Sequence, residues 1–202
     1  MSCNYGQSYA NAHKRFVLSG IWQLPVGEGQ RFLNRGGVVN ALLGGWQASG
    51  IYSYQTGFPF TVVSNRDWSN SLSGLRLPDR TCNGNNGPKT VAEWFDTSCF
   101  TTTYLQAAFN AGTPRYGNEV RNGLIGPTYN NLDFALLKNF SLSERFKLQF
   151  RFETFNTFNH ANFSAPNSTA NTATNGQITS TVNTGIANNA NRDIQFALKL
   201  SF

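Results

Sequence analysis

The chain has 202 residues and a net charge of +6, and 13% of its residues are charged while 14% are aromatic. Soluble domains carry about 25% charged residues, so this composition is unusually poor in charge. The sequence holds no apolar run of the length that a transmembrane helix needs. Its basic residues are scattered, with no stripe of Lys and Arg between stacking aromatics, which argues against nucleic-acid binding.

Five segments carry apolar residues at every second position, which is the period of a β-strand. They cover residues 16–24, 46–54, 132–142, 146–152 and 194–202. Such strands show one oily face and one polar face, as the wall of a membrane barrel requires. We therefore predict an all-β fold, an antiparallel meander of about five long strands that forms part of a transmembrane β-barrel with long external loops.

The second and fourth segments give more specific predictions. The second is expected to continue through Phe58 and Phe60 towards Val63. In the fourth, the apolar residues from Phe146 to Phe152 alternate with Lys147, Gln149, Arg151 and Glu153. That segment is the clearest two-faced strand of the chain.

The pairing of the third and fourth strands is restricted by this alternation. Opposed residues of an antiparallel pair share a face, so we expect Phe140 opposite Phe146 and Leu136 opposite Phe150. Even-numbered residues then lie opposite even-numbered residues, so the connection between these two strands must contain an odd number of residues. We predict three residues at 142–144 or five at 141–145, or else a β-bulge.

The connections between strands alternate in length. A tight turn joins the third strand to the fourth, whereas residues 64–128 and 156–191 form long connections. Outer-membrane barrels have short periplasmic turns and long external loops. We therefore expect 64–128 to be a large external loop and 25–45 to be a longer periplasmic connection with a short turn of helix.

Lys138 is a basic residue on the predicted lipid face. A Lys at the midplane of a barrel costs roughly 2–4 kcal/mol, and the cost falls near the interfaces. Lys138 lies close to the periplasmic turn, so we expect its ammonium group to reach headgroups or water.

The last strand ends the chain on an aromatic residue. Its oily face consists of Ile194, Phe196, Leu198, Leu200 and Phe202. This face resembles the closing strand of Gram-negative outer-membrane barrels, where the pattern is the signal that the barrel-assembly machinery reads.

Four further stretches are informative, namely residues 13–25, 42–52, 57–62 and 152–160. They resemble the C-terminal barrel segments of TonB-dependent outer-membrane receptors, in the group with an N-terminal carboxypeptidase-regulatory-like domain. The resemblance implies a barrel of about 22 strands with a plug domain. It also implies uptake of a scarce, bulky ligand across the outer membrane, driven by an inner-membrane energy-transducing complex.

The resemblance covers nearly the whole chain, but its pattern is incomplete. Residues 1–5 show no signal peptide, and no plug domain or energy-coupling segment is recognisable. Five strands cannot close, because the smallest outer-membrane barrels have about eight. We therefore expect residues 1–202 to be the C-terminal portion of a barrel, which depends on the rest of that barrel and its plug and cannot transport alone.

Two alternative functions remain open from the sequence. The chain could belong to a passive porin-like barrel, or it could be a soluble secreted β-sandwich for carbohydrate binding or adhesion. The sandwich would bury Ile194, Phe196 and Leu198 in its own core. No catalytic, metal-binding or cofactor-binding pattern is found, so we expect no enzyme activity.

The large loop contains the remaining candidate residues. Cys82 and Cys99 are predicted to form a disulfide, the alternative being two free thiols. An excess of aromatic residues could contact a ligand, but we prefer a short helix at 91–95 whose rings pack the loop onto the barrel rim. The candidate contact residues are Trp68, Trp94, Tyr104 and Tyr116.

Overall fold

The computed structural model contains two compact units. It describes residues 6–34, 36–72, 74, 76–143, 145–182 and 190–202. The expectations for residues 1–5 and for Glu144 lie outside these ranges. We call residues 16–54, 130–162 and 182–202 the sheet unit, and residues up to 15, 55–129 and 163–181 the loop unit.

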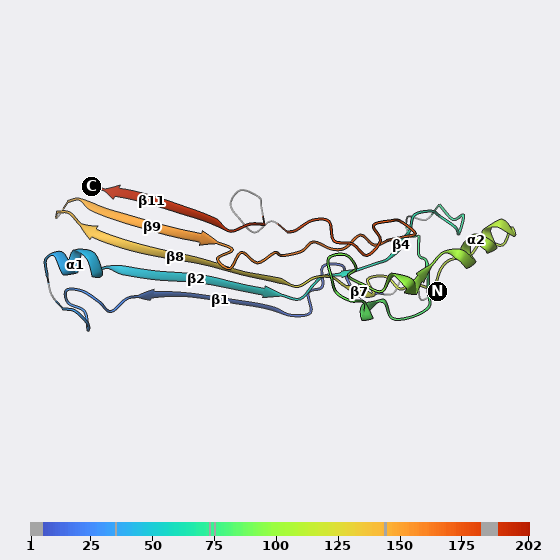
Figure 1. The fold of residues 1–202 in the computed structure, drawn as a ribbon, viewed down its shortest axis with the longest axis horizontal. Helices are drawn as coiled ribbons and strands as arrows, with labels where there is room; N and C mark the ends of the chain where they lie inside the picture. The colour runs from blue at the N-terminus through green and yellow to red at the C-terminus, as the bar shows by residue number, and fades with distance from the viewer. Residues whose placement is uncertain (1–5, 35, 73, 75, 144, 183–189) are drawn as a thin grey trace. The chain divides into compact units, whose positions relative to one another are not determined.

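The sheet unit is built on five long strands (Figure 1). Each strand lies beside the next long strand along the chain, in the order β1-β2-β8-β9-β11. The predicted antiparallel meander is therefore confirmed, and the sheet is open, with β1 and β11 at its edges. The elements are β1 (Arg15–Gln23), α1 (Val38–Leu43), β2 (Trp46–Gln55), β8 (Tyr129–Ser141), β9 (Lys147–Phe155) and β11 (Asp193–Ser201).

In the β8–β9 pair, even-numbered residues lie opposite even-numbered residues, as predicted. Phe140 pairs with Leu148 and Leu136 with Phe152, so the expected partners are wrong by two residues while the shared face is right. β8 ends at Ser141 and β9 begins at Lys147, which leaves an odd connection of five residues, 142–146. The shift arises because Phe146 accepts hydrogen bonds from Leu142 and Ser143 in the turn.

The connection from β1 to β2 includes the short helix α1, as expected. Its C-terminal end is followed by Gly45, whose φ of 70° favours glycine. A side chain there would also meet the backbone oxygen of Asn139 at 2.9 Å. Asn139 donates its N–H to the Gly45 carbonyl at 3.2 Å, so this glycine allows β2 to begin directly against β8.

The loop unit contains short elements in place of long strands. Three two-stranded ladders occur in it, with β3 and β7 antiparallel, β5 and β6 antiparallel, and β10 and β4 parallel. The elements are β3 (Pro59–Phe60), β4 (Val63–Ser64), β5 (Asp79–Arg80), η1 (Gly84–Asn86), η2 (Thr97–Cys99), β6 (Phe100–Thr101), α2 (Thr103–Asn110), β7 (Leu124–Ile125) and β10 (Thr169–Ala170).

Two sequence expectations fail in the loop unit. β2 ends at Gln55, and the residues from Pro59 to Ser64 pair with β7 and β10 instead of lengthening it. Residues 91–95 form bends, not a helix. Their backbone is engaged elsewhere, because the Trp94 N–H donates to the Gly176 carbonyl at 2.8 Å.

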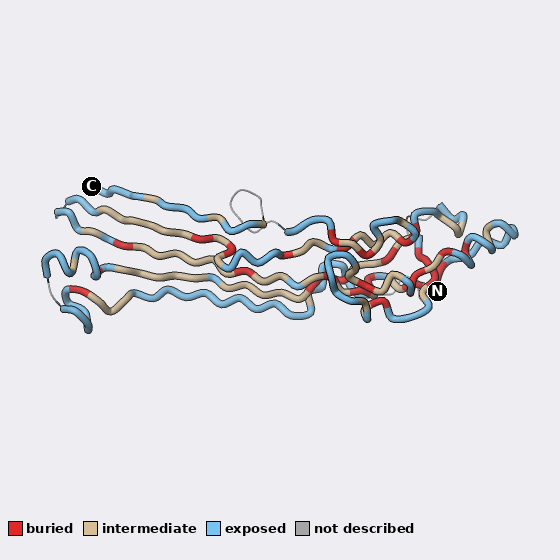
Figure 2. The backbone as a smooth tube through the Cα atoms, viewed as in Figure 1, coloured by how far each residue is buried: buried red, intermediate tan, exposed pale blue. Residues whose placement is uncertain are grey.

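Buried residues concentrate in the loop unit (Figure 2). Its core is formed by Val62, Phe95, Cys99, Phe100, Leu124 and Ala170. These residues come from the connection between β2 and β8 and from the connection between β9 and β11, so residues 64–128 do not form a loop by themselves. No helix within the described ranges is long and apolar enough to cross a membrane.

Candidate functional site

The oily face of the sheet is exposed. On β11, Phe196 and Leu198 are 68% and 70% exposed. Ile194, Leu200 and Phe202 are exposed as well, and none of the five is covered by a second sheet. This arrangement contradicts the β-sandwich alternative, in which the same side chains form a closed core.

Aromatic side chains pack across the two last strands on this face. Phe196 lies opposite Phe152, and their ring centroids are 5.3 Å apart. Phe150 lies diagonally from Phe196 at 6.3 Å. Rings at such distances stabilise a cross-strand pair. The pairing therefore places three rings side by side on this face, with Phe196 the most exposed of them.

The opposite face of β9 and β11 is polar, and its charges are separated along the strands. Asp193 and Glu153 belong to neighbouring residue pairs on this face, near one end of the β9–β11 strand pair. Lys199 and Lys147 belong to neighbouring residue pairs near its other end. Arg151 lies between the two groups and contacts Glu153 at 2.6 Å. Charged side chains at this density indicate water or polar protein against this face.

Lys138 is buried on the oily face, at 3% exposure, so the expectation that its ammonium group reaches headgroups or water is wrong. Its Nζ donates to the Gly44 carbonyl. The same atom lies 5.1 Å from the centroid of the Trp46 ring and 4.8 Å from that of Phe140. The carbonyl and the two ring faces replace water around the charge.

A two-faced antiparallel sheet with an uncovered oily side has the geometry of a wall segment of a transmembrane β-barrel. The model of one protein family, described as an outer membrane beta barrel domain, matches residues 1–195. The chain belongs to the outer-membrane β-barrel family. No curated protein and no solved structure gives a match to it.

Family membership assigns an environment to the wall of this barrel protein. Its location is the outer membrane, and membrane lipid lies against the barrel wall. The even-numbered residues of β11 form the side suited to lipid, and the odd-numbered residues form the polar side. Both sides could be predicted from the sequence, because the alternation of apolar and polar residues is visible within a single strand.

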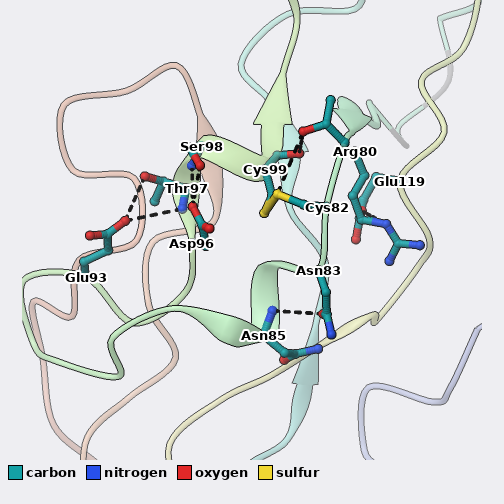
Figure 3. The surroundings of a disulfide bond; sticks show 11 residues. Arg80, Cys82, Asn83, Asn85, Glu93, Asp96, Thr97, Ser98, Cys99 and Glu119 are labelled. Carbon is teal, nitrogen blue, oxygen red and sulfur yellow. Dashed lines mark hydrogen bonds and ion pairs between the residues drawn. A yellow bond between two sulfur atoms is a disulfide. The ribbon is translucent and has the colours of Figure 1, made fainter.

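The loop unit of the barrel protein is held by a disulfide (Figure 3). The bond joins Cys82 to Cys99, 17 residues apart. Asp96 lies near both sulfur atoms. Because each sulfur is bonded to the other, this group does not offer thiolate ligands to a metal. The Asp96 carboxylate instead accepts hydrogen bonds from the Ser98 N–H and hydroxyl.

Two ion pairs occur near the disulfide-bonded segment. Arg115 donates to both oxygens of Asp79, at 2.9 and 2.7 Å. Glu119 is fully buried, and its nearest counter-charge is Arg80 Nε at 3.6 Å. Burial raises the pKa of Glu119 to about 6, and the Arg80 charge opposes this rise. Sequence reasoning missed both pairs, because no periodic signal links these positions.

The four candidate aromatic residues of the loop unit have different environments. Trp94 packs against the core and donates its indole N–H to the Ile125 carbonyl at 2.9 Å. Tyr104 is 65% exposed on α2. Trp68 and Tyr116 both line one small hollow. The structure therefore brings two of the four together.

Proposed function

We propose that this chain is part of a TonB-dependent receptor that takes up a ligand across the outer membrane with energy from the inner membrane. The observation that carries the proposal is the strand β11, whose exposed apolar residues alternate with polar ones as in the wall of a transmembrane barrel. The four receptor-like stretches add the specific class.

The open edges of the sheet support a larger barrel. β1 and β11 each have one side without a neighbouring strand among the described residues. In lipid, every unsatisfied backbone group costs several kcal/mol, so a five-stranded sheet needs further strands beside it. We propose that the remainder of the same barrel supplies these strands, and that the barrel-assembly machinery recognises β11.

The polar face of the sheet is consistent with a barrel lumen that contains a protein domain. Its separated charges on β9 and β11 can pair with a plug domain of opposite pattern. We further propose that the long connections face outwards and the 142–146 turn faces the periplasm, as in other outer-membrane barrels. No catalytic role is proposed for the described residues.

An electrical measurement separates this proposal from a passive porin. The barrel that contains this chain is purified from outer membranes and inserted into a planar bilayer. A plugged receptor conducts almost no ions at rest and binds the purified periplasmic part of the energy-transducing complex. Steady open-channel conductance without that binding would assign the chain to a porin instead.

A further inference from the structure

A small hollow in the loop unit carries features of a ligand site. It is lined by three short segments and one residue of α2, and it includes three arginines. Its lining includes Arg66, Asp67, Trp68, Arg76, Arg115 and Tyr116. The hollow has room for roughly one water-sized group, so it can accept only a single oxygen atom of a larger molecule.

The Trp68 indole N–H is buried without a hydrogen-bond partner among the described residues. The ring itself is fixed, because it packs edge-on against Phe109 at 5.9 Å. The Arg66 guanidinium lies over the Trp68 ring, 4.6 Å from its centroid. A fixed buried donor without an acceptor is unfavourable, so an acceptor that enters the hollow gains binding free energy.

The charges around the hollow favour an anion. Arg115 is neutralised by Asp79. Within the described ranges, Arg66 and Arg76 form no ion pair with a carboxylate. Asp67 is the one acidic residue of the lining, and it already accepts hydrogen bonds from Ser69 and from the backbone N–H groups of residues 71 and 72.

We propose that this hollow receives one oxygen of a ligand's carboxylate or phosphate group, with Trp68 Nε1 donating to that oxygen and with Arg66 and Arg76 supplying positive charge at the rim. The exposed ring of Tyr116 then borders the rest of the ligand. The proposal deepens the proposed function and depends on it for the outward position of the loop unit. Binding in solution does not depend on that position.

The test follows the indole N–H resonances of the full chain labelled with ¹⁵N-tryptophan and purified in detergent. Trp68→Phe identifies the Trp68 signal, because it removes the N–H and keeps a ring. Phenyl phosphate, inorganic phosphate and benzoate are the anionic probes, and benzamide is the neutral one. We expect the anions to shift the Trp68 signal and benzamide to leave it unchanged.

Charge variants give the affinity test. Arg66→Gln and Arg76→Gln are each expected to weaken anion binding by about tenfold, the effect of one charge-assisted hydrogen bond. Arg121→Gln removes the same charge from an exposed position of the loop unit outside the hollow, and it should bind normally. An unchanged Trp94 indole signal shows that each variant remains folded.

Three outcomes overturn the proposal. The Trp68 signal does not respond to any anion, which indicates that the hollow holds only water. Benzamide binds as well as benzoate, which indicates ring stacking without charge recognition. Arg121→Gln weakens binding as much as Arg66→Gln, which indicates general charge attraction. If anions bind but the barrel conducts like a porin, the site stands and the proposed uptake mechanism fails.

Discussion

The sheet unit and the loop unit place the same kinds of side chain in opposite environments. Phe196 on β11 is 68% exposed, whereas Phe95 in the loop unit is fully buried. The sheet has lipid outside its apolar face and needs no interior of its own. The loop unit buries its rings in a core of its own. Apolar content therefore does not indicate an interior until the surrounding solvent is known.

The largest expected difference comes from one ring in each unit. Phe95→Ala leaves a cavity in the loop core and should destabilise that unit by about 3–5 kcal/mol. Phe196→Ala removes a ring of the same size from the lipid face and should leave the loop unit intact. Hydrogen exchange of loop-unit amides measures both effects. Equal loss of protection in the two variants would contradict the separation of the units.

A charge placed on either face of β11 tests which side meets lipid. Leu198→Arg puts a guanidinium near the middle of the oily face and should cost roughly 2–4 kcal/mol. Gln195→Arg puts it on the polar face opposite Glu153, where it gains a counter-charge. Urea unfolding of the barrel in lipid vesicles compares the two. A larger loss for Gln195→Arg would reverse the assignment of faces.

Reduction of the disulfide should affect the loop unit alone. A closed loop of this length contributes roughly 3 kcal/mol in the chain-entropy picture. Limited proteolysis with and without dithiothreitol should show faster cleavage of the loop unit after reduction and unchanged cleavage of the sheet. The Cys82→Ser, Cys99→Ser double variant is the control, because the reductant should then have no effect.

The smallest effect is a pH dependence of the loop unit. The pKa of Glu119 is about 6 in the folded chain and has an ordinary value of 4.5. The folded state therefore binds the Glu119 proton more tightly than the unfolded state does. The resulting contribution to the free energy of unfolding is fully present below pH 4.5 and is lost as the pH rises to about 6. Its size is about 2 kcal/mol.

Glu119→Gln keeps the shape of the side chain and cannot ionise. The pH dependence between 4.5 and 6 should disappear in thermal unfolding of this variant. Persistence of the full dependence would mean that another group is responsible.

The sheet could be predicted from sequence because its signal is local. Alternation from Phe146 to Phe152 identifies β9 without knowledge of any partner. The exact register was less accessible, since it depends on how Phe146 closes the turn. Lys138 was misplaced for a related reason. Its partners Gly44 and Trp46 lie about ninety residues earlier in the chain, and only the register brings them to it.

The loop unit was mostly beyond prediction. Its core combines Val62, Phe95, Leu124 and Ala170, which no periodicity connects. The helix α2 did leave a signal, because Leu105, Ala108 and Phe109 have helical spacing. The hollow depends on segments around residues 66, 76 and 115 that meet only after folding. Sequence reasoning named its two aromatic residues and missed its arginines.

The parity of the strand pairing limits how this gene can change in length. Even-numbered residues face even-numbered residues in the β8–β9 and β9–β11 ladders. Inserting or deleting one codon within β9 would turn every following side chain of that strand to the opposite side, unless a bulge absorbed the change. Codons can be gained or lost in pairs without this penalty. Related genes should therefore differ by even steps inside their strands and by any number in the loop unit.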